Sequence, residues 1–157
     1  MLRVRLKIGD GAIKDTTDYG LVYLSADHRF APETKGFEAT SYPEEEGEHI
    51  LTKTVDAPFD YKVRFFIDAG GSLGNANDII ADFNSRLYHQ DNGSDLKEFY
   101  QVEFYNDYKK VKIVGYPHPI SEATDFWRDQ AGHTSDVVVV EWTIRVIKPS
   151  LCDFNLE

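Results

Sequence analysis

The sequence predicts a mainly β fold of the α+β type: an antiparallel two-sheet sandwich or a partly closed barrel with one flanking α-helix, about residues 75–88. Three observations favour this fold class. Runs of alternating apolar and polar residues, typical of half-buried strands, recur along the 157-residue chain. Aromatic residues, which favour strands, make up 13% of it. Apolar residues follow helical spacing in one stretch. We expect about seven or eight strands in a single domain, residues 1–157.

The first predicted strands precede an acidic tip. Residues 2–8 alternate apolar and basic side chains and predict a first strand, residues 19–25 a second, and residues 37–42 a short third. Four glutamates then surround one glycine: Glu44, Glu45, Glu46 and Glu48 around Gly47. Like charges this close repel one another, so we expect this tip to be solvated or to face cations.

The clearest strand and the helix come next. Residues 60–67 place four apolar side chains on one face: Tyr61, Val63, Phe65 and Ile67. After a glycine-rich break, an apolar stripe follows helical spacing: Ala76, Ile79, Ile80, Phe83 and Leu87. Asn75 is the predicted N-cap. We expect the stripe to lie against an edge or opening of the sheets.

The last third predicts a hairpin, a loop and a final strand. Residues 99–105 and 108–116 flank Asn106-Asp107, which predicts a tight turn. Residues 117–135 read as a long irregular connection, a kind of segment that often carries contacts. Its contact candidates are His118, Phe126 and Trp127. Residues 136–148 predict a final strand whose first half has no polar face.

Composition and motifs exclude several functions. The net charge of −10 argues against a nucleic-acid backbone as the main partner. No stretch reaches the ~18 apolar residues that span a bilayer, so we expect no membrane partner. The scattered histidines, the single Cys152 and the glycines at residues 70–74 match no metal, nucleophile or nucleotide spacing. We therefore expect no catalytic residue, no metal and no cofactor, and a protein that is not an enzyme.

Two other functions stay open from the residues themselves. Tyr116, Phe126 and Trp127 would suit a carbohydrate- or ligand-binding β-sandwich, in which aromatic side chains near the long loop contact the ligand. The carboxylates of Glu45 and Glu46 would suit a hydrolase that uses the acidic cluster.

The order of the motifs resembles the N-terminal domain of siphophage distal tail proteins, within the phage tail component family. In that family a hairpin with a Pro–Gly acidic turn is followed by a Y-x-V-x-F-x-I strand, a helix that ends in Leu-aromatic, a hairpin that ends in apolar-Gly, and a strand running to Pro. The corresponding segments here are SYPEEEGEHI, DYKVRFFI, NDIIADFNSRLY, EFYQVEFYNDYKKVKIVGY and VVVVEWTIRVIKP. The resemblance covers about residues 18–149. At the acidic tip this chain departs from the Gly-Arg-Asp-Gly that the family often has.

The resemblance implies a structural protein of a phage or prophage tail. It implies a homo-oligomeric ring, a hexamer in that family, around a channel through which DNA passes transiently, with other tail proteins as partners. The protein would belong to the virion tail and be assembled in the cytoplasm of the host bacterium. On this interpretation the subunit interface or the lumen includes the tip residues Tyr42, Pro43, Glu44, Glu45, Glu46, Gly47 and Glu48.

Overall fold

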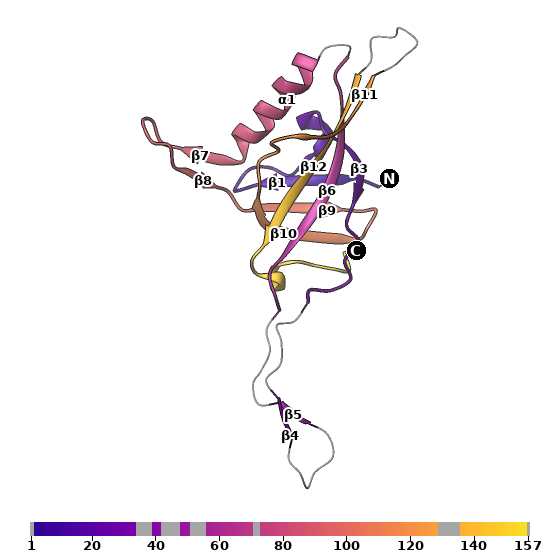
Figure 1. Ribbon diagram of the computed structural model, residues 1–157, viewed down its shortest axis with the longest axis vertical. Coiled ribbons are helices and arrows are strands. Elements are labelled where there is room, and N and C mark those ends of the chain that lie inside the picture. Colours follow the sequence, from indigo (N-terminus) through magenta and orange to yellow (C-terminus); the bar gives the residue numbers. More distant parts are fainter. Residues whose placement is uncertain are drawn as a thin grey trace.

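The protein folds into two layers of antiparallel strands with one α-helix beside them (Figure 1). The structure, a computed structural model, describes residues 2–33, 39–41, 48–50, 56–70, 73–128 and 136–156. The first layer runs in the order β2 (Lys14–Asp15), β1 (Val4–Ile8), β9 (Val102–Asn106) and β10 (Val111–Pro117). The second contains β12 (Asp136–Val146), β6 (Phe59–Asp68) and β3 (Val22–Ala26), with β11 (Ala123–Arg128) on the start of β12.

The two layers are continuous through the end of β10. Tyr116 and Pro117 pair with Arg145 and Ile144 of β12, while the rest of β10 pairs with β9. A Cβ atom at Gly115 would collide with the backbone of Arg145, so the crossing requires glycine. The sandwich form of the sequence prediction is confirmed, and the described strands form no closed barrel.

Aromatic side chains fill the core between the layers. The Trp142 ring of β12 lies 6.3 Å from Phe65 of β6 and 6.3 Å from Phe104 of β9, measured between ring centroids. Phe65 and Phe104 also meet edge to face at 6.5 Å. All three side chains are fully buried. The alternation predicted for residues 60–67 is confirmed, because Tyr61, Val63, Phe65 and Ile67 have no exposed surface.

The helix α1 (Leu73–Arg86) covers one end of the core. Its Phe83 ring meets Trp142 edge to face at 5.3 Å, and Ala76 and Leu87, just past the helix, are buried as well. The predicted helix is confirmed, with bounds shifted by two residues. The predicted N-cap is wrong, because Asn75 lies inside the first turn and its side-chain amide donates to the Ala69 carbonyl at 2.9 Å.

Two short ribbons lie outside the eight-stranded sheet. β4 (Ala39–Ser41) pairs with β5 (Glu48–Ile50), and Figure 1 draws this pair at the end of the molecule away from α1. β7 (Tyr88–Gln90) pairs with β8 (Lys97–Phe99) directly after the helix. Two short 3-10 helices, η1 (Thr16–Tyr19) and η2 (Pro149–Leu151), complete the described elements.

Three sequence predictions are corrected. The β9–β10 hairpin has four residues between Asn106 and Val111 instead of a two-residue turn, because the Asn106 side-chain oxygen accepts hydrogen bonds from the backbone amides of Tyr108 and Lys109. The run 99–105 is interrupted, so Tyr100 belongs to no strand. The stretch 117–135 contains β11, which pairs with β12 from Ala123 to Arg128, and is therefore not irregular throughout.

Candidate functional site

The acidic tip is described only at its edges. Tyr42, Pro43, Glu44, Glu45, Glu46 and Gly47 lie outside the described residues, so the prediction for them stays a prediction. Glu48 is the first residue of β5 and pairs with Ser41 of β4. The two strands that flank the tip therefore form an antiparallel ribbon, as the sequence predicts for a hairpin-like excursion.

Of the three loop candidates, His118 lies at a groove on the outer face of the second layer. Its backbone amide donates to the Thr143 carbonyl of β12 at 2.9 Å, and its side chain is exposed. The groove has a volume of about 850 Å³, and its floor comes from β6 and β12 while residues 118–124 form its wall. Phe126 and Trp127 lie in β11, in register with Val138 and Val137 of β12.

Charged side chains on the floor of the groove and directly beside it form a paired network. Arg64 contacts Glu141 at 3.3 Å and donates to the Ser25 hydroxyl at 2.6 Å, and the Lys62 ammonium lies 3.9 Å from Glu141. Such half-exposed pairs contribute little stability individually, but together they fix the positions of the charges. Among the groove-lining residues, Asp60, Glu122 and Glu141 outnumber the single Lys62. Since Asp60 pairs with Arg145 at 3.2 Å and Glu141 with Arg64 and Lys62, the groove is a polar surface whose floor carboxylates are paired with cations.

The wall of the groove is fixed by a helix residue that the sequence analysis missed. The Asn84 side-chain amide donates to the Ile120 carbonyl at 2.8 Å, and the Ile120 amide donates to the Asn84 side-chain oxygen at 2.9 Å. This double hydrogen bond joins α1 to the segment between β10 and β11. A polar residue directly after the buried Phe83 is a weak signal in the sequence, and periodicity alone does not reveal its partner.

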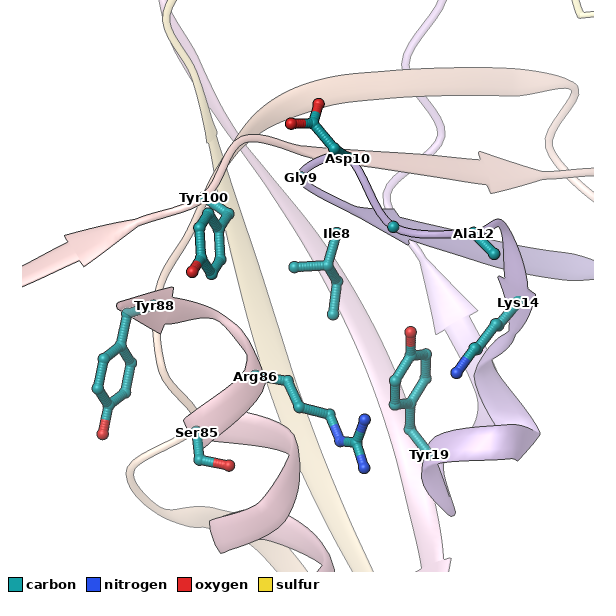
Figure 2. Close-up of a pocket in the computed structure, with 11 residues that line it drawn as sticks. Ile8, Gly9, Asp10, Ala12, Lys14, Tyr19, Ser85, Arg86, Tyr88 and Tyr100 are labelled. Carbon is teal, nitrogen blue, oxygen red and sulfur yellow. The ribbon is translucent and has the colours of Figure 1, made fainter. Parts of the chain in front are cut away.

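A second concave surface, also missed, lies where the turn after β1 meets the end of α1 (Figure 2). It has a volume of about 570 Å³ and is lined by the rings of Tyr19, Tyr88 and Tyr100 and the cations of Lys14 and Arg86. Figure 2 shows Ile8 between the tyrosines, with the Arg86 and Lys14 side chains extending toward Tyr19. The residues come from three separated segments, so no local sequence motif predicts the pocket.

Two tyrosines of this pocket are held in place by ring contacts with phenylalanines. The Tyr19 ring meets Phe83 edge to face at 5.7 Å, and the Tyr88 ring meets Phe99 at 5.5 Å. Burial raises the pKa of the Tyr19 hydroxyl, while the nearby Arg86 guanidinium acts in the opposite direction and Asp18 adds to the rise. Tyr19 therefore stays a neutral hydroxyl, able to donate and accept hydrogen bonds.

The described residues place no three His, Cys, Asp or Glu side chains where they could hold a metal ion. The helices within the described ranges include none that is long and apolar enough to cross a membrane.

Comparisons with known proteins find similarity among solved structures. No family model matches the sequence, and no curated protein matches it either. Among solved structures, the crystal structure of the SPP1 Dit (gp 19.1) protein, described as a paradigm of the hub adsorption apparatus in phages that infect Gram-positive bacteria, is similar over 90% of this chain, with a TM-score of 0.48 and 14% identity. The chain spans about half the length of that protein, 49% of which the likeness covers.

Proposed function

We propose that this protein is a structural component of a phage or prophage tail, of the distal tail type, and that its copies assemble into a ring. The observation that carries the proposal is the match between motif order and element order. The segments that resemble the distal tail family form a ribbon, a core strand, a helix, a hairpin and a closing strand: β4–β5, β6, α1, β9–β10 and β12.

The elements also have the chemistry that the resemblance requires of them. The Leu-aromatic end of the helix motif is the buried Leu87 followed by Tyr88, and the apolar-Gly end of the hairpin motif is Gly115, where the two layers cross. The closing strand supplies Trp142 to the core and runs to Pro149, which begins η2. The resemblance therefore rests on positions that hold the fold together.

The assembly that we propose is a hexameric ring with a heterologous interface, through whose channel DNA passes and on whose faces other tail proteins bind. The ribbon that carries Glu44–Glu48 would contact the neighbouring subunit or face the lumen. An extended ribbon can add to a neighbour's sheet, and an acidic lumen would repel phosphates and prevent DNA from sticking.

Native mass spectrometry and negative-stain micrographs over a wide range of protein concentrations test this proposal. The expected result is a ring of six copies whose population grows with concentration, because association follows mass action. A strict monomer at every concentration, with no ring in the micrographs, would contradict the proposal.

The role of the acidic tip is tested by changing Glu44, Glu45, Glu46 and Glu48 together to glutamine. If the tip contacts a neighbour, the oligomer population changes; if it faces the lumen, the ring persists and only its interaction with DNA changes. A control variant of equal net charge changes four exposed carboxylates on α1 and around the β7–β8 ribbon to amides, at Asp78, Asp91, Asp95 and Glu98. An identical response of the two variants would refer the effect to net charge and not to the tip.

A further inference from the structure

We propose that the pocket of Figure 2 binds a saccharide that carries a carboxylate, such as a uronic-acid unit of an acidic polysaccharide. The inference goes beyond the proposed structural role and does not depend on it. It rests on the aromatic rings, the cations and the mixed hydrogen-bonding groups that this one concave surface brings together.

Tyr100 supplies the main apolar face against which a sugar ring packs, because Lys97 lies over the Tyr88 ring at 4.5 Å and Arg86 over the Tyr19 ring at 5.9 Å from the centroids. Tyr88 and Tyr100 form one side of the pocket and Tyr19 the other, with Ile8 between them (Figure 2). Tyr100 is 39% exposed, and its ring lies beside Gly9, whose positive φ of 56° forms the turn after β1. Aromatic side chains with a polar end are suited to ligands that are apolar on one face and wet on the other.

The cations supply the preference for a negative ligand. Arg86 and Lys14 line the pocket, and among the described residues that line it Asp10 is the only carboxylate, in a chain whose net charge is −10. The Arg86 Nε atom contacts Asp82 at 3.1 Å, and in the part of the chain that the structure describes no hydrogen bond reaches its two Nη atoms. A guanidinium with free Nη atoms binds a carboxylate by charge-assisted hydrogen bonds.

The remaining lining groups match the hydroxyls of a sugar. The tyrosine hydroxyls donate and accept hydrogen bonds, and the Asp10 carboxylate accepts them. The Ser85 hydroxyl donates to the Asp82 carbonyl at 2.7 Å and can accept a further hydrogen bond. Arg86 is the last residue of α1, and the partial negative charge at this helix end disfavours a purely anionic ligand. This combination favours an acidic sugar over an inorganic anion or a run of glutamates.

An NMR titration of the wild-type protein with a hyaluronan tetrasaccharide tests the proposal. We expect amide shifts at Gly9, Gly11, Tyr19, Arg86 and Tyr100. Chitotetraose, which shares the N-acetylglucosamine but has no carboxylate, should bind at least about tenfold more weakly, the ratio that one charge-assisted hydrogen bond provides.

Variants assign the binding to the two kinds of group. Arg86→Gln and Tyr100→Ala should each weaken binding of the tetrasaccharide at least about tenfold. The matched controls are Arg145→Gln, which alters an arginine of similar exposure paired with Asp60, and Tyr108→Ala, which removes a tyrosine exposed to 53% in the β9–β10 turn. Both controls should bind like the wild type.

Three results would overturn the proposal. The first is the absence of shifts at these amides at about 10 mM tetrasaccharide, a concentration that would fill a millimolar site. The second is equal binding of chitotetraose, which would remove the role of the cations. The third is equal or tighter binding of a tetraglutamate peptide to the same amides, which would make the pocket a site for acidic peptides.

Discussion

At the scale of the residue, Trp142 is the point where both layers and the helix meet. Its ring contacts Phe65, Phe83 and Phe104, one from each of the second layer, the helix and the first layer. Its indole Nε1 is buried and finds no acceptor among the described residues. The residue therefore contributes through burial and through aromatic contacts, edge to face with Phe83 and Phe104 and tilted with Phe65, which add about 0.5–1.5 kcal/mol per aromatic pair.

A substitution of Phe83 tests how much the helix contributes to the core around Trp142. We expect Phe83→Ala to lower the free energy of unfolding by about 3–5 kcal/mol, because it empties a fully buried site against Trp142 and Tyr19. Urea denaturation monitored by tryptophan fluorescence measures the change. Leu96→Ala, at a side chain that is 82% exposed, is the control and should stay within about 0.5 kcal/mol. A loss below about 1 kcal/mol in Phe83→Ala would mean that the helix does not cover this core.

Tyr61 gives the protein a dependence on alkaline pH. Burial raises the pKa of its hydroxyl well above the usual range, and the nearby Asn106 side chain offsets only part of the rise. Above about pH 10 the unfolded chain releases this proton while the folded chain retains it, so the free energy of unfolding falls as pH rises. We expect Tyr61→Phe to make this fall of the unfolding free energy with pH less steep, by up to about 1.4 kcal/mol per pH unit.

Denaturation curves of Tyr61→Phe and the wild type between pH 8 and 11 measure that slope. Near pH 7 the variant should be almost as stable as the wild type, because the Tyr61 hydroxyl has no hydrogen-bond partner to lose among the described residues. Parallel curves for the two proteins throughout this range would contradict the prediction.

At the scale of the element, periodicity determined what could be predicted. The strand β6 and the helix α1 were predicted within two residues because their apolar positions repeat at two and at three to four residues. β11 was missed because its sequence, ATDFWR, does not alternate and its pairing with β12 is interrupted by a bulge between Ala123 and Asp125. The hairpin turn was wrong because the Asn106 side chain satisfies two turn amides, which residue type alone does not show.

The candidate sites depended even less on local pattern. His118 was singled out from the sequence and lies at a groove, but the groove exists only because β6 and β12 pair along their whole length beside it. The pocket of Figure 2 combines Lys14, Arg86 and Tyr100, which are brought together by the turn after β1 and the end of α1. A single sequence contains no signal for such long-range placement.

Asn84 tests how firmly the helix fixes the wall of the groove. We expect Asn84→Ala to cost about 1–3 kcal/mol, because it leaves the half-buried amide and carbonyl of Ile120 without their partner. Hydrogen exchange at the Ile120 amide should accelerate, as local opening becomes easier. Asn77→Ala, at an exposed position of the same helix, is the matched control for helix propensity. Equal exchange rates at Ile120 in the two variants would show that the double hydrogen bond does not hold this segment.

At the scale of the whole molecule, the charges are unevenly distributed. On the outer face of the first layer Glu103 contacts Lys7 and Lys112, each at 3.5 Å, and Tyr105 lies between Arg5 and Lys112 at 5.2 and 5.6 Å from its centroid. The groove on the outer face of the second layer has more carboxylates than cations. The total remains −10, so association of copies must overcome repulsion between them.

Ionic strength therefore tests what controls assembly. The Debye length falls from about 30 Å at 0.01 M to about 8 Å at 0.15 M, so salt should screen the repulsion between copies whose net charge is −10. We expect the weight-average mass in light scattering to rise with sodium chloride at constant protein concentration. Sucrose at the same osmolality is the control for excluded solute and should not reproduce the rise in mass. A mass that falls with salt would show instead that attraction between opposite charges on neighbouring copies outweighs the net repulsion, and would direct mutagenesis to the basic face around Tyr105.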